Sequence, residues 1–124
     1  MQVSIQLPKD GSEFNTQIRE MLAEYGDEEF CLSLIEVFIR DGATTLELLR
    51  SSAESGDRKK SYAAAHSLKN MLGVLRSTRG VELAERVCIE LNADSPGPSI
   101  HELLGLTAQL LETCRALVAA SRTA

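Results

Sequence analysis

Apolar residues recur at three- and four-residue steps along most of this chain, and that period constrains the fold more than any other feature. The stretch 61–77, SYAAAHSLKNMLGVLRS, shows the period clearly. The two-residue alternation of a β-strand occurs only in QVSIQL near the start, which is too isolated to pair. The pattern predicts an all-α protein.

Glycines and capping residues set the limits of the first two predicted helices. The first runs from about residue 12 to residue 24 and stops at Gly26, and Asp27 is placed to cap the second. The second runs from residue 28 to about residue 53. Gly42 is a weak point at which it could instead divide into two helices. Its predicted apolar stripe consists of Phe30, Leu34, Val37, Phe38, Thr45, Leu48 and Leu49.

Three more helices follow in the second half of the chain. Asp57 can cap a helix over about 58–76, and Ser77 can cap the next one. The stretch NADSPGPS, 92–99, ends that helix. The last helix then opens at Ser99, with Glu102 three residues on as in a capping box.

Connections of about two to eight residues between long helices favour antiparallel neighbours. We therefore predict an up-down antiparallel four-helix bundle with a short extra N-terminal helix. The 124 residues suit a single domain over 1–124, and the N-terminal segment 1–11 and the tail 121–124 are expected to be poorly ordered.

Composition narrows the class of function. The net charge of −5 argues against a nucleic-acid surface, which needs clustered cations. No stretch reaches 18 apolar residues, and the N-terminus lacks the pattern of a secretory signal, so we expect no membrane span and a cytoplasmic protein. The spacing of Cys31, Cys88 and Cys114 matches no zinc or redox motif, and we expect buried, reduced thiols.

His66 lies opposite the apolar face of its predicted helix. With about 100° of rotation per residue, Ala64, Leu68 and Leu75 gather on the side away from the histidine. Lys69 is its neighbour one turn along. The geometry alone leaves two readings open, a surface histidine without a role and a histidine exposed for chemistry.

Small and polar residues surround His66 on the exposed face. Tyr62, Ala63, Asn70 and Gly73 fall on the same side, where a partner's surface could approach the ring closely. A glycine inside a helix lowers stability by about 1 kcal/mol. Gly73 is on the exposed face, so packing within the protein gives no reason for a glycine there. We predict that these four residues contribute to a docking surface, together with part of the short first helix.

The residues around His66 resemble a known family. A-H-S-L-K-N at 65–70 is followed by G-V-L and then E-L-A-E-R-V, and the upstream stretch 25–57 has an acidic start and a long apolar stripe ending in G-D. This resembles the histidine-containing phosphotransfer (HPt) domain family, whose hallmark is A-H-x-L-K-G on a bundle helix. The resemblance covers roughly residues 14–91, and the length of the last predicted helix also fits the family.

The resemblance implies a phosphorelay carrier in a multistep two-component pathway. His66 would accept a phosphoryl group from a receiver-domain aspartyl-phosphate, with Lys69 stabilising the charge, and pass the group to another receiver domain. The implied partners are response-regulator receiver domains and a hybrid sensor histidine kinase, and the implied state is a monomer. No cofactor is implied in this chain, because the receiver domain would supply Mg²⁺. Imidazole suits the role as a nucleophile with an ordinary pKa of about 6.5.

Three positions depart from the family pattern. Asn70 and Arg76 stand where glycines are expected, and Cys88 stands where Gln or Glu often faces the histidine. They leave open an alternative, a helical adaptor that docks receivers or kinases with weak or no phosphotransfer.

Other classes fit poorly. A di-iron bundle needs Glu three residues before an inward histidine, but Ala63 precedes His66 and Pro98 precedes His101. We read His101 as a surface residue and expect no metal site. The sequence has no nucleophile elbow and no phosphate-binding glycine loop. We therefore expect a carrier that is not an enzyme, with no ATP site and no autokinase activity.

Overall fold

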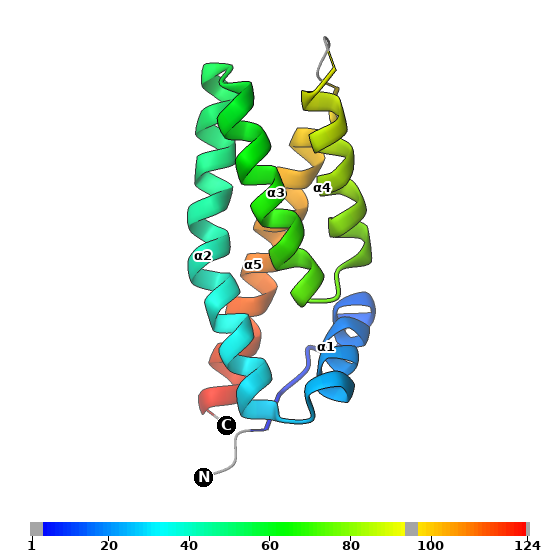
Figure 1. The fold of residues 1–124 in the computed structure, drawn as a ribbon. Coiled ribbons are helices and arrows are strands. Elements are labelled where there is room, and N and C mark those ends of the chain that lie inside the picture. Colours follow the sequence, from blue (N-terminus) through cyan, green and yellow to red (C-terminus); the bar gives the residue numbers. More distant parts are fainter. Residues whose placement is uncertain (1–3, 94–96, 124) are drawn as a thin grey trace.

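The computed structural model describes residues 4–93 and 97–123 and, within them, contains helices and no strands (Figure 1). The helices are α1 (Ser12–Tyr25), α2 (Glu28–Ser55), α3 (Arg58–Val74), α4 (Thr78–Leu91) and α5 (Ser99–Thr123). In the bundle, α2 packs against α3 and α5, and α4 packs against the same two helices. The short α1 contacts α2 and lies beyond the ends of α3 and α4 (Figure 1). The all-α bundle with an extra N-terminal helix is therefore confirmed.

The predicted caps form at three helix starts. The carboxylate of Asp27 accepts a hydrogen bond from the backbone N–H of Phe30 at 3.1 Å, and Asp57 does the same for Lys60 at 3.0 Å. The hydroxyl of Ser77 accepts from Gly80 N–H at 3.2 Å. Each cap satisfies a donor that the first turn of a helix leaves unpaired, so the local sequence fixes where α2, α3 and α4 begin.

Two of the predicted helix ends are confirmed by left-handed glycines, Gly26 with φ 69° and Gly56 with φ 74°. Between them α2 is continuous, so the weak point at Gly42 is not a break. This glycine is buried against the ring of Phe38, which a Cβ would approach to 2.9 Å. Close packing therefore accounts for it.

The apolar stripe predicted for α2 was wrong at three positions. Phe30, Val37 and Leu48 are exposed by 47%, 43% and 56%, respectively. The face of α2 that enters the core is rotated away from them and includes Cys31, Leu32, Ile35, Phe38, Leu46 and Leu49.

The connection from α4 to α5 is held at both sides of its undescribed centre, residues 94–96. The Glu90 carboxylate accepts hydrogen bonds from Ser99 N–H at 3.2 Å and from its hydroxyl at 2.5 Å. The Arg58 guanidinium donates to the carbonyls of Leu91 and Ala93. Ser99 therefore hydrogen-bonds to Glu90 of α4, whereas the capping-box pattern predicted an interaction with Glu102.

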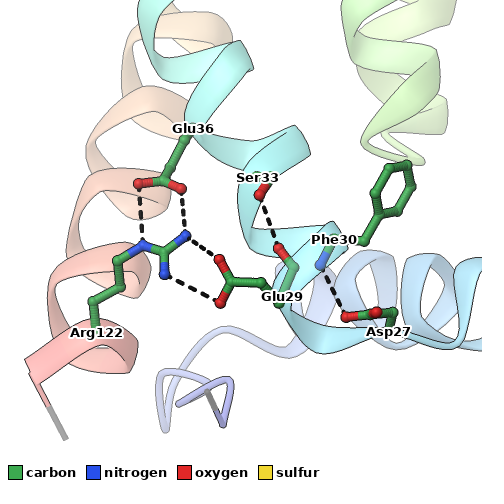
Figure 2. Close-up of polar contacts among 6 residues, drawn as sticks. All are labelled: Asp27, Glu29, Phe30, Ser33, Glu36 and Arg122. Atoms are coloured by element: carbon green, nitrogen blue, oxygen red, sulfur yellow. Dashed lines mark hydrogen bonds and ion pairs between the residues drawn. The ribbon is translucent and has the colours of Figure 1, made fainter. Parts of the chain in front are cut away.

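Arg122 fastens the end of α5 to the start of α2 (Figure 2). Its guanidinium donates to Glu29 at 2.9 and 3.2 Å and to Glu36 at 2.6 and 3.1 Å. The hydrogen bonds from Arg122 lower the pKa of Glu36 below its ordinary 4.5. The last turn of α5 is therefore held against the first turns of α2.

The N-terminal segment reaches the same region. Ile5 N–H donates to Glu28 at 2.5 Å, and Gln6 N–H donates to the hydroxyl of Ser121 at 2.9 Å. Helix α5 continues to Thr123, past the predicted end near residue 120. Residues 1–3 and 124 lie outside the described residues, and poor order at the two chain ends stays a prediction.

Within the described residues, α5 is the one helix long and apolar enough to cross a membrane by length and composition. Core helices of soluble proteins pass the same test, and α5 packs its apolar stripe against α2 and α4. The stripe has partners inside the bundle, so this is weak evidence for a membrane span.

Candidate functional site

His66 is exposed on α3, as the helical wheel predicts. Ala64, Leu68 and Leu72, on the opposite face, are 6%, 0% and 0% exposed and belong to the core. The bundle therefore anchors α3 by its apolar face and presents the imidazole to solvent. A rigid helix is a better platform for a reacting group than a loop, because the backbone holds the ring in place.

Tyr62 lies one turn before His66 and stacks against it. The two ring centroids are 6.3 Å apart, and the ring planes differ by only 5°. Tyr62 is 38% exposed, and His66 is exposed beside it. The two parallel rings are therefore neighbours on the exposed face of α3.

Lys69 is brought next to the histidine, as predicted, and it contacts a residue that the sequence did not single out. Its ammonium lies 3.7 Å from the Glu85 carboxylate on α4, and the two side chains are 33% and 52% exposed. Both line a shallow pocket of about 270 Å³ together with Tyr62, His66, Cys88 and Ile89. The pocket joins the exposed faces of α3 and α4 around the imidazole.

Ala63, Asn70 and Gly73 are exposed on the same face of α3 as His66. A Cβ built on Gly73 would meet only Val81, at an ordinary contact distance of 3.8 Å. Packing within the bundle therefore does not require this glycine. Ala63 also borders a larger hollow of about 600 Å³ between α2 and α3, which the exposed Leu48 lines from the other side.

Arg76 occupies the left-handed region with φ 61°, so α3 ends at Val74, two residues before the predicted end. Arg76 N–H donates to Gly73 and Ser77 N–H donates to Leu72, an arrangement that usually carries glycine at the left-handed position. The absence of the expected glycine here is therefore a departure with a backbone cost. The Arg76 guanidinium pairs with Glu24 of α1.

Cys88 is half-buried in the pocket, whereas Cys31 and Cys114 are buried as predicted, and all three thiols are free. Burial raises the pKa of the Cys88 thiol; Lys69 lowers it and Glu85 raises it. The thiol therefore stays protonated at neutral pH and adds no charge next to the imidazole. Cys88 fills the position without the hydrogen-bonding reach of a Gln or Glu.

The structure adds Glu85 and Ile89 to the predicted site. Both line the pocket with Cys88; Glu85 lies three residues before Cys88, and Ile89 lies four residues after Glu85. Once Cys88 was placed opposite the histidine, the three-residue spacing could have found Glu85. Among residues 4–93 and 97–123, no group of three or more His, Cys, Asp or Glu is placed to hold a metal ion. His101 is exposed at the start of α5.

These features define a class of protein: a helical bundle in which a rigid helix presents an exposed histidine with a cation beside it. The family model of the Hpt domain matches residues 33–123. The chain therefore belongs to the Hpt domain family, whose members carry phosphoryl groups in two-component signalling and interact with receiver domains and histidine kinases. Comparison with curated proteins and with solved structures gave no match.

Proposed function

We propose that the chain is a phosphorelay carrier that accepts a phosphoryl group on His66 from a receiver aspartyl-phosphate and passes it to a second receiver. The observation that carries the proposal is the exposed imidazole of His66 beside the Lys69 ammonium in one pocket. Phosphoryl transfer asks little of the acceptor beyond positioning and charge stabilisation, and this pair supplies both.

The reaction balances with residues of this chain and one receiver. A lone pair on an imidazole nitrogen of His66 forms the N–P bond while the P–O bond to the aspartate breaks. The electron pair returns to the aspartate carboxylate. Lys69 acts as a point cation on the phosphoryl oxygens, and Tyr62 stacks beside the ring. The receiver supplies Mg²⁺, and the second transfer reverses these steps on another aspartate.

The docking surface in this proposal is the exposed face of α3 at Tyr62, Ala63, Asn70 and Gly73, together with part of α1, which lies beyond the end of α3 (Figure 1). Small side chains at Ala63 and Gly73 leave room for a receiver to bring its aspartate to the ring. The carrier acts as a cytoplasmic monomer and needs no ATP site, because the phosphoryl group arrives already activated.

Labelling by a phosphorylated receiver tests the site directly. The wild-type protein should gain a label that is labile in acid and stable in base, and His66→Gln should abolish it without changing the circular dichroism spectrum. His101→Gln is the matched control, because it removes the other histidine of the chain, also exposed, from a different helix. Label that survives in His66→Gln would refute the assignment.

The second candidate is a docking adaptor with little transfer, and Asn70 and Cys88 favour it. Asn70 is exposed where the family pattern has glycine, and Cys88 faces the pocket where an amide or carboxylate often stands. Asn70→Gly should speed transfer if the side chain obstructs docking. If the wild-type protein binds phosphorylated receivers but never becomes labelled, the adaptor is the correct reading.

A further inference from the structure

The Lys69–Glu85 ion pair couples the two helices of the site and places an acidic group beside the residue that would neutralise a phosphoryl group. Among the six described residues that line the pocket, Lys69 carries the only permanent positive charge and Glu85 the acidic one. In the unphosphorylated protein the two charges offset each other. A phosphoryl group on His66 would bring an additional charge of about −1.5 to −2 into the same pocket.

We propose that Glu85 is a positioning residue that biases this carrier toward donating its phosphoryl group, by competing with the phosphohistidine for Lys69. This inference rests on the proposed function and adds a direction to the phosphoryl flow. When His66 is phosphorylated, Lys69 must leave Glu85 to contact the phosphoryl oxygens, or stay with Glu85 and leave them less compensated. In both cases the phosphohistidine is less stable than it would be if Lys69 had no ion pair with Glu85.

The rest of the pocket does little to offset this competition. Cys88 holds a protonated thiol, whose pKa burial raises, and Ile89 is 70% exposed and apolar. Tyr62 stacks on the imidazole and offers no cation to a phosphoryl group. The charge balance of the phosphorylated site therefore depends on whether the Lys69 ammonium contacts Glu85 or the phosphoryl group.

Glu85→Gln isolates the charge with almost no change of shape. With wild-type receiver as partner, the equilibrium share of phosphoryl group on His66 should rise, with the transfer equilibrium constant moving about two- to fivefold, the range for partly exposed charge pairs. This change in the equilibrium constant should shrink as salt is raised from about 0.05 M to about 0.5 M. Salt screens both the attraction of Glu85 to Lys69 and its repulsion of the phosphoryl group. Glu82→Gln, an exposed residue of α4 outside the pocket lining, is the matched control.

A second measurement uses no receiver. Phosphoramidate phosphorylates exposed histidines chemically, so each variant carries His101→Gln, which leaves His66 as the one histidine of the chain. The unfolding midpoint of the phosphorylated and unphosphorylated protein is then compared for each variant. Phosphorylation should change the unfolding equilibrium constant more favourably in Glu85→Gln than in the wild type, again by about two- to fivefold. Glu82→Gln should match the wild type.

The two measurements separate the two hypotheses. If no receiver labels the wild-type protein, the proposed function fails, while the chemically phosphorylated protein still reports whether Glu85 opposes a phosphoryl group at His66. If Glu85→Gln leaves both equilibria unchanged, or lowers the phosphorylated share, Glu85 does not compete for Lys69 and the inference is wrong. The second outcome would mean that Glu85 holds Lys69 in a productive position.

Discussion

The left-handed conformation of Arg76 predicts that Arg76→Gly is more stable than Arg76→Ala. Both substitutions remove the ion pair with Glu24, so their difference isolates the Cβ at a backbone with φ 61°. A non-glycine residue in this region costs about 1–2 kcal/mol. The greater freedom of glycine in the unfolded chain returns about 0.4–1 kcal/mol of that. We expect Arg76→Gly to exceed Arg76→Ala by about 0.5–1 kcal/mol in free energy of unfolding.

Urea unfolding followed by circular dichroism measures this difference. A change of that size should separate the thermal midpoints of the two variants by about 2–5 °C in a chain of this length. Glu24→Gln measures the contribution of the Arg76–Glu24 ion pair alone, because it leaves residue 76 unchanged. This substitution should lower the free energy of unfolding by less than about 1 kcal/mol, since the side chains of Arg76 and Glu24 are both partly exposed. If Arg76→Ala equals or exceeds Arg76→Gly in stability, the backbone reasoning is refuted.

Three further predictions concern the site and the chain ends. Gly73→Ala should raise the free energy of unfolding by about 0.5–1 kcal/mol in urea titrations, because its Cβ meets only Val81, and should slow transfer if a receiver approaches there. Cys88→Gln should speed receiver-dependent labelling, since an amide can orient the imidazole, and an unchanged rate would contradict this. Glu36→Gln should cost about 0.5 kcal/mol at pH 7 after solvent screening. The pKa of Glu36 in the folded protein lies below 4.5, so the wild type should keep its full advantage over Glu36→Gln above pH 4.5. The difference in free energy of unfolding, measured by urea titration, should disappear as the pH falls through the folded pKa.

Local signals made most of the fold predictable. The caps at Asp27, Asp57 and Ser77 and the glycines at 26 and 56 act within one turn of chain, and each occurs where the sequence indicates. The exposure of His66 was also predictable, because the phase of one helix depends only on its own apolar residues. The apolar stripe of α2 was less predictable. A 28-residue helix packs different faces on different neighbours, and Phe30 and Leu48 lie outside the faces that pack.

The part of the site that lies on α4 depends on the register between two helices. Glu85 reaches Lys69 because the turn at residues 75–77 sets the height of α4 against α3. That turn contains Arg76 in a conformation that the sequence would assign to glycine. A change of one residue in the register would rotate α4 by about 100° and move Glu85 out of the pocket. The backbone at Arg76 and the charge balance at His66 are therefore coupled, and Arg76→Gly tests whether the register survives when the Glu24 contact is removed.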